Sequence, residues 1–185
     1  MQVSVALVPP EGVVNEIEAI IDGTPGARAQ LDVVPTGALR LPLIGLGNLT
    51  RPDVEALCEH LVELVAGIGM TPRIGLAGAV ALESPDDPTV SLGIVGDVDG
   101  MIAVAKALPP MVSDFGFYVD RRRFVPKFTV ARVTAGTTLP VLQALVDKLE
   151  RYRSREWDLE GVEVLSRVHR DDGAIFERVH TLYTS

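Results

Sequence analysis

The chain has 185 residues, of which 47% are hydrophobic and 23% charged, so it can fill a core of one domain or of two small lobes without disulfides. Its formal net charge is −8 and its pI is about 4.9. Such a surface repels a polyanion at long range, which argues against broad binding of duplex DNA but leaves room for a local basic cleft.

The first half of the chain begins with a predicted strand and a predicted helix. Apolar residues alternate over residues 1–8, as in a strand with one buried face. The helix opens at Pro9 and Pro10, and an apolar stripe with helical spacing continues it until Gly23. The elements expected next are strands over 29–34 and 40–46 and a helix capped by Thr50.

The second half repeats the pattern of paired strands between helices. Its first elements are strands over 73–82 and 89–95 and a helix capped by Asp97 or Asp99. Pro109 and Pro110 are expected to disturb the end of that helix. The last elements are a strand over 124–133, a helix capped by Thr137 or Thr138, and strands over 159–168 and 175–183 around a turn at 171–173. Strands that come in pairs favour an α+β architecture over a doubly wound parallel sheet.

Cysteine usage and the N-terminus predict a cytoplasmic protein. The single cysteine, Cys58, has no partner for an internal disulfide, and its place in a helical apolar pattern predicts a packed structural thiol. Residues 1–8 lack the basic start of a secretory signal, and no apolar stretch approaches the length of a membrane span.

Common catalytic motifs are absent from the sequence. It has no glycine-rich phosphate loop, no cysteine and histidine set with zinc spacing, and no nucleophile elbow. The three histidines, His60, His169 and His180, are scattered, and His60 is expected on the solvent side of its helix. We therefore expect neither a metal nor a cofactor.

Two segments share a pattern of a basic residue followed two positions later by a residue on the same strand face. The first segment is Arg40-Leu41-Pro42-Leu43, and the second is Lys127-Phe128-Thr129-Val130. Both resemble the HxTx motifs of the two-histidine phosphoesterases, the group of 2′-5′ RNA ligases and cyclic phosphodiesterases. The second segment also resembles the family around the motif. A basic-aromatic-x-Pro sequence, Arg123-Phe124-Val125-Pro126, precedes it, and Ala131-Arg132 follows it.

The resemblance extends over nearly the whole chain. Residues 5–11 are similar to the opening strand and turn of the family, and residues 164–167 and 173–177 are similar to its closing hairpin. The family fold implies a single domain over residues 1–185. That domain would have two pseudo-symmetric lobes, each with an antiparallel-rich sheet flanked by helices, around a central cleft.

The match fails at the motif residues themselves. In the family, one histidine is the general base, the other is the general acid, and the threonines donate hydrogen bonds to the phosphate. Here Arg40 and Lys127 stand at the histidine positions, Pro42 stands at the first threonine position, and Thr129 alone is retained.

The replacements differ in what chemistry they allow. A guanidinium stays protonated in proteins, so Arg40 can neutralise a phosphate but cannot accept a proton. Pro42 has neither a hydroxyl nor an N–H, and a proline in a strand favours an edge or distorted position. Lys127 would become a proton-transfer group only if burial and like charge disfavour its ammonium form.

An anion site is what survives of the ancestral chemistry. Arg40, Lys127 and Thr129 are expected to face a phosphate, with Lys127 and Thr129 as the candidate catalytic residues. The expected rim consists of Arg123 and of Tyr118, whose ring would stack on a base. Arg132, on the opposite strand face, is expected to form a structural ion pair.

Three functions are compatible with these residues. The first is a catalytically degenerate protein that binds a nucleotide or an RNA terminal phosphate in the cleft. The second is an active phosphodiesterase or RNA ligase that uses Lys127 or a rearranged acid and base. The third is a structural or interaction module with a vestigial cleft. The oligomeric state does not follow from the sequence.

Overall fold

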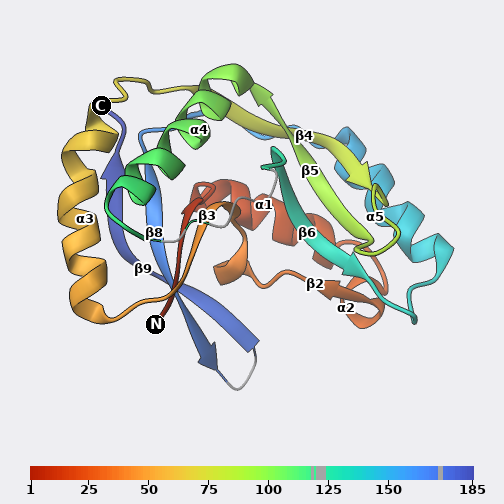
Figure 1. Cartoon of the computed structure of the whole chain (residues 1–185). Helices are drawn as coiled ribbons and strands as arrows, with labels where there is room; N and C mark the ends of the chain where they lie inside the picture. The colour runs from red at the N-terminus through yellow and green to blue at the C-terminus, as the bar shows by residue number, and fades with distance from the viewer. Residues whose placement is uncertain (118, 120–123, 171–172) are drawn as a thin grey trace.

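In the computed structural model, which describes residues 1–117, 119, 124–170 and 173–185, two antiparallel sheets lie against flanking helices (Figure 1). The first sheet has the strand order β3-β1-β8-β9. Its strands are β1 (Gln2–Leu7), β3 (Leu41–Asn48), β8 (Gly161–Arg170) and β9 (Gly173–Tyr183). The sheet thus brings together the two ends of the chain.

The second sheet has five strands in the order β2-β6-β5-β4-β7. Every pairing in it is antiparallel. Its strands are β2 (Leu31–Val33), β4 (Arg73–Ala81), β5 (Thr89–Gly96), β6 (Lys127–Val133) and β7 (Trp157–Asp158). Except for the short β2, this sheet is built from the middle of the chain.

The helices divide between the two sheets. Helix α3 contacts β9 and α4 contacts β3, whereas α5 packs on β4 and also contacts α1 (Figure 1). The helical segments are α1 (Glu11–Asp22), α2 (Ala27–Gln30), the 3-10 turn η1 (Thr36–Ala38), α3 (Arg51–Ala66), α4 (Val98–Asp114) and α5 (Leu139–Arg151). The expected α+β class, with two antiparallel sheets flanked by helices, is confirmed.

Local sequence signals explain where the longer helices begin. Thr50 and Asp53 form a capping box at the start of α3, in which each side chain accepts a hydrogen bond from the other residue's backbone N–H. Asp97 caps α4 by accepting from the N–H of Gly100 at 2.9 Å. Thr138 occupies the N-cap position of α5, but its hydroxyl donates to Gln30 instead of accepting from the helix.

One hydrophobic cluster joins both sheets and the helices into a single core. Phe128 of β6, Leu92 of β5, Ile44 of β3 and Leu108 of α4 are all at most 1% exposed within it. Burial on this scale is the main stabilising term of such a fold. The core therefore fixes the four-stranded and five-stranded sheets relative to each other and holds any site between them.

Pro42 lies where the sequence predicted a strand edge or distortion. Strand β3 is the edge of its sheet, so a residue without an N–H interrupts no further ladder. The register also shifts here, because Val5 pairs with Ile44 while Ala6 pairs with Pro42, which leaves Leu43 without a partner in β1. The irregularity lies directly beside Arg40.

Three local expectations were wrong, and one short strand was missed. Helix α4 continues through Pro109 and Pro110 to Asp114, because full burial of Leu108 and Val112 holds its last turn in place. Residues 27–30 form a helical turn, so the strand predicted over 29–34 shortens to β2. The two-residue strand β7 was not expected at all. The predicted turn at 171–173 includes residues outside the described part of the chain.

The third wrong expectation concerns His60, which is not on a solvated face. Its ring stacks on Phe115 with centroids 4.6 Å apart, and its Nε2 is buried without a hydrogen-bond partner. Phe115 lies at the C-terminal end of α4, which the sequence predicted to be disturbed. Cys58, on the same helix α3 as His60, is buried as predicted, and burial raises the pKa of its thiol. Among the described residues, no helix is long and apolar enough to cross a membrane.

Candidate functional site

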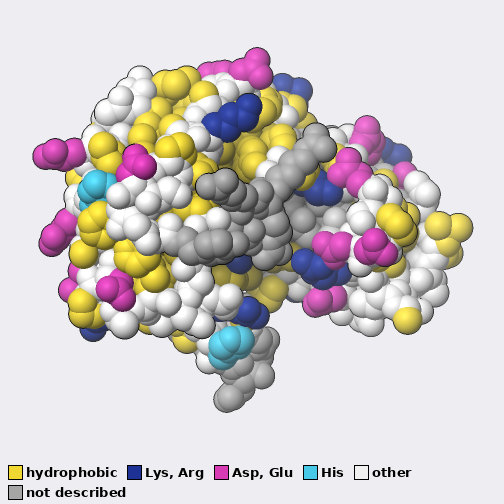
Figure 2. All heavy atoms as spheres, viewed as in Figure 1, with side chains coloured by type: hydrophobic (Ala, Val, Ile, Leu, Met, Phe, Trp, Pro, Cys, Tyr) yellow, Lys and Arg dark blue, Asp and Glu magenta, His cyan; other side chains and the backbone are white. Residues whose placement is uncertain are grey.

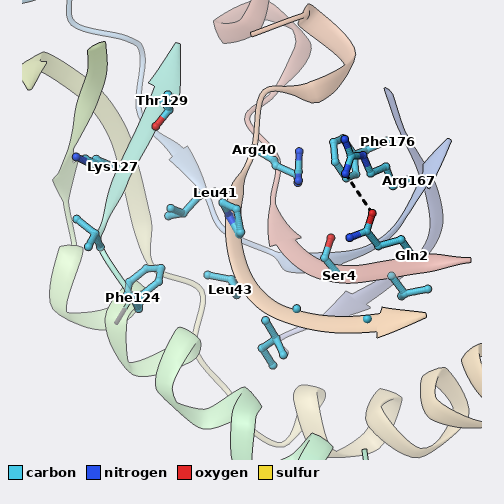
Figure 3. A pocket seen from close by; sticks show the side chains of 16 residues that line it. Gln2, Ser4, Arg40, Leu41, Leu43, Phe124, Lys127, Thr129, Arg167 and Phe176 are labelled. Atoms are coloured by element: carbon cyan, nitrogen blue, oxygen red, sulfur yellow. Dashed lines mark hydrogen bonds between the residues drawn. The ribbon is translucent and has the colours of Figure 1, made fainter. Parts of the chain in front are cut away.

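A cleft of about 480 Å³ lies between the two sheets and contains the predicted motif residues. Arg40, Lys127 and Thr129 all line it, although Arg40 is 87 residues before Lys127 in the sequence. Figure 3 shows Arg40 on one side of the cleft and β6, with Lys127 and Thr129, on the other. The fold therefore assembles the three described residues that the sequence predicted, one from the four-stranded side and two from the five-stranded side.

Arg40 is held at the start of β3 by contacts that do not neutralise its charge. Its Nη1 donates to the backbone oxygen of Ala38 at 3.2 Å, and its Cζ lies 3.1 Å from the ring centroid of Phe176, a cation–π contact. Its Nε is buried and has no hydrogen-bond partner. Burial, and secondarily the nearby charge of Arg167, lowers the pKa of Arg40 to about 10, so the guanidinium stays protonated at neutral pH.

Arg167 is a cleft residue that sequence reasoning missed. It lies on β8, and the strand register places it directly opposite Gln2 of β1 and Phe176 of β9. Its Nη1 donates to the Gln2 Oε1 at 3.2 Å, which orients the guanidinium without neutralising it (Figure 3). Strand alternation alone puts Arg167 and Leu165 on one face, but only the pairing with β1 shows that this face borders the cleft.

The four-stranded side also carries an unpartnered hydroxyl. In the described part of the chain, three buried side-chain atoms lack a hydrogen-bond partner: Ser4 Oγ, Arg40 Nε and His60 Nε2. Two of these three residues, Ser4 and Arg40, line the cleft. Buried polar atoms without partners carry a free-energy cost, and two of the three residues that have such an atom line this cleft.

On the five-stranded side of the cleft, Lys127 and Thr129 have partners within the protein. The Lys127 Nζ donates to the Glu83 Oε2 at 2.6 Å, and the Thr129 hydroxyl lies 3.2 Å from that of Ser91. The Lys127 side chain is 21% exposed and that of Glu83 is 54% exposed, so the ion pair is accessible to solvent. The positive charge of Lys127 is therefore offset by Glu83 in this structure.

Charge is distributed unevenly around the cleft as a result. Within the described residues, Arg40 and Arg167 have no carboxylate within ion-pair distance, whereas Lys127 has Glu83 and Arg132 has Asp87. Figure 2 shows basic side chains in the middle of this face, with acidic side chains beside them on the right, toward the five-stranded sheet. The ion pair of Arg132 is the one expected from its position on the opposite strand face.

Two predicted rim residues lie outside the described part of the chain. Tyr118 and Arg123 belong to the segments that the structure does not describe, so their predicted contacts with a ligand stay predictions. The described residues hold no group of three or more histidine, cysteine, aspartate or glutamate side chains that would bind a metal ion.

Solved structures with the same architecture exist at low sequence identity. TT0787 of Thermus thermophilus is 20% identical with a TM-score of 0.72, and the alignment covers 100% of this chain and 98% of that one. E. coli LigT complexed with 3′-AMP is 17% identical with a TM-score of 0.70, and coverage is again 100% and 98%. A phosphoesterase structure is 16% identical with a TM-score of 0.70 over 100% and 98% of the two chains.

This chain has the fold of LigT and TT0787. The coverage of both chains from end to end confirms the fold that the motif segments implied. No protein-family model and no curated protein sequence matches the chain, and identities of 20% or less show the fold alone. Other LigT structures were determined with phosphate, ATP and NADP+, over 100% of this chain at TM-scores of 0.65, 0.63 and 0.68.

Proposed function

We propose that the protein binds a phosphate-bearing ligand, a nucleotide or an RNA end, in its central cleft and that it lacks efficient hydrolysis. The observation that carries the proposal is a pair of arginines, Arg40 and Arg167, that line a cleft of about 480 Å³ with no carboxylate partner in the described residues. Guanidiniums that no carboxylate offsets are suited to phosphate, which they can bind through bidentate hydrogen bonds.

The ligands of the LigT structures support the same ligand class. LigT was solved with 3′-AMP, phosphate, ATP and NADP+, all of which carry phosphate groups. A shared fold makes the corresponding cleft the place to look, while the residues of this chain supply the chemical argument. In this proposal Arg40, Lys127 and Thr129 contact the phosphate, and Arg123 and Tyr118 contact the rest of the ligand.

The side chains at the motif positions support binding over turnover. Acid–base catalysis in the family fold requires a proton acceptor on one side of the phosphate and a donor on the other. Arg40 keeps its proton at neutral pH, and the Lys127 ammonium is hydrogen-bonded to the Glu83 carboxylate. General acid–base steps contribute about a hundred- to ten-thousand-fold each, so their loss leaves a site that holds phosphate and turns it over poorly.

Calorimetric titration with inorganic phosphate and 3′-AMP tests the proposal. We expect saturable binding that is lost in Arg40→Ala and weakened in Lys127→Ala, while the exposed Arg151→Gln on α5 changes nothing. Absence of binding in the intact protein would leave the third function, a vestigial cleft, as the better account.

Product analysis separates binding from catalysis. Incubation with 2′,3′-cyclic nucleotides and 2′-5′-linked dinucleotides is expected to give no turnover above the uncatalysed rate. Turnover that disappears in Lys127→Ala would identify an active enzyme with Lys127 as its proton-transfer group. Turnover that survives in that variant would show that the catalytic residues are elsewhere.

A further inference from the structure

Among the described residues that line the cleft, the positive charges without a carboxylate partner lie on one wall, in Arg40 and Arg167. Arg40 and Arg167 are close enough for the charge of Arg167 to lower the pKa of Arg40, and neither has a carboxylate partner in the described residues. Two like charges that lie close together without a counter-charge destabilise the folded state. A bound anion would relieve this repulsion, so both positive charges are available for a ligand.

The neighbours of these arginines orient them without reducing their charge. Gln2 accepts a hydrogen bond from Arg167, Ala38 accepts one from Arg40, and the ring of Phe176 lies under the Arg40 guanidinium. Each of these partners is uncharged. Arg178, on β9, is the contrasting case, because Glu163 pairs with it at 2.9 Å.

Hydrogen-bond donors without acceptors also lie on the wall that carries the two arginines. The Arg40 Nε has a proton to donate and no acceptor, and the Ser4 hydroxyl also lacks a partner. Figure 3 shows Ser4, Arg40, Arg167 and Phe176 grouped on one side of the cleft. The Arg40 Nε and the Ser4 hydroxyl are both buried, so the donors that the wall presents to the cleft are the guanidiniums of Arg40 and Arg167. A tetrahedral oxyanion with several terminal oxygens can accept hydrogen bonds from two guanidiniums at once.

We propose that the wall formed by Ser4, Arg40 and Arg167 is a seat for a terminal phosphate monoester, and that it discriminates against phosphodiesters. This inference rests on the proposed function and narrows its ligand class. A monoester carries a charge of about −1.5 to −2 at pH 7 and has three terminal oxygens. A diester or a cyclic phosphate carries one charge and two terminal oxygens, so it leaves one guanidinium uncompensated.

Arg167 is the residue that sets this specificity. Arg40 alone neutralises a monoanion, and Arg167 adds the second positive charge from the neighbouring strand β8. Lys127 does not substitute for it, because Glu83 already offsets that ammonium. The preference for a monoester is therefore expected to depend on Arg167 and to be insensitive to other exposed arginines.

Binding of 3′-AMP compared with 2′,3′-cyclic AMP at pH 7.5 tests the inference, because the two ligands share the base and the sugar. In the intact protein we expect 3′-AMP to bind at least about tenfold more tightly, the effect of one additional charge-assisted hydrogen-bonded pair. In Arg167→Gln that ratio is expected to fall to about one, mainly through loss of 3′-AMP affinity. Arg167→Lys, which keeps the charge, is expected to retain most of the ratio, and Arg151→Gln all of it.

The outcomes separate this inference from the proposed function. Equal affinity for the two ligands, or an unchanged ratio in Arg167→Gln, would overturn the monoester seat while leaving the phosphate cleft in place. Failure of both ligands to bind the intact protein would overturn both proposals. Thermal melting of each variant without ligand confirms that the comparison is made between folded proteins.

Discussion

The two walls of the cleft differ in how their polar groups are satisfied. On the five-stranded side, Lys127 pairs with Glu83 and Thr129 lies within hydrogen-bond distance of Ser91. On the four-stranded side, Arg40 and Arg167 have only uncharged partners in the described residues, and Arg40 has a buried nitrogen with none. Among the described residues, the polar groups of the first wall are therefore paired within the protein, whereas the second wall has two positive charges that no carboxylate offsets.

This difference bears on the function that we propose. A pair of histidines can exchange protons, whereas the cations Arg40 and Lys127 attract negative charge. The protein offsets one of those cations internally with Glu83. The other, Arg40, keeps its charge beside Arg167, and the proposal therefore assigns phosphate binding to the four-stranded side.

The largest expected effect of removing the charge from the four-stranded wall is on phosphate affinity. Replacing Arg40 with methionine removes the charge, the unpartnered Nε and the contact with Phe176. Loss of charge-assisted hydrogen bonds costs about 1.5–3 kcal/mol, so the dissociation constant for 3′-AMP should rise roughly 10- to 100-fold. Isothermal titration calorimetry measures the change. A loss of similar size in Lys127→Met would mean that both walls hold the ligand equally.

The same Arg40→Met substitution should stabilise the protein when no ligand is present. The pKa of Arg40 is lowered to about 10, which means that the folded state disfavours its charge. One pKa unit corresponds to about 1.4 kcal/mol, and solvent screening reduces the effect, so we expect a gain of about 1 kcal/mol, or roughly 2–4 °C in Tm. Scanning calorimetry at pH 7 tests it, and a decrease in Tm would show that the Phe176 contact outweighs the burial.

The pH dependence of that difference has a definite sign. A base whose pKa is lower in the folded state than in the unfolded chain favours folding when it loses its proton. The stability deficit of the intact protein relative to Arg40→Met should be constant below about pH 10 and should shrink as the pH rises above about 10, toward the ordinary pKa of an arginine. Urea midpoints of both proteins at pH 8 and pH 10.5 give the difference. A deficit that grows with pH would contradict this assignment.

The smallest effect is a gain rather than a loss of affinity. Glu83→Gln keeps the size of the side chain and removes the charge that offsets Lys127. The released ammonium should tighten binding of 3′-AMP about threefold, the scale of a partly exposed ion pair. In the double variant Glu83→Gln/Lys127→Met the gain should vanish. If Glu83→Gln weakens binding instead, Glu83 positions Lys127 for the ligand and does not compete with it.

Much of the fold was predictable because its signals are local. Alternation over residues 1–8, the cap at Thr50 and the edge position implied by Pro42 all depend on the chemistry of one short segment. The break expected at Pro109 and Pro110 was wrong because burial from distant elements decides the end of α4. Strand β7 was missed because two residues are too few to form a pattern.

The candidate site was predictable only in part, for a related reason. Arg40, Lys127 and Thr129 stand in a motif pattern, and the fold brings them to one cleft. Arg167 has no such pattern, because its place depends on the register between β1 and β8. The partner of Lys127 was equally hidden, since Glu83 reaches it from the connection between β4 and β5, 44 residues away. Long-range pairing decides which charges remain for a ligand.

A crystal structure of the protein with 3′-AMP tests the central claim most directly. The account predicts phosphate oxygens about 2.7–3.0 Å from guanidinium nitrogens of both Arg40 and Arg167, with the Lys127–Glu83 pair still formed. A phosphate bound by Lys127 and Thr129 alone, with Arg40 still stacked on Phe176 and out of contact with the ligand, would contradict it.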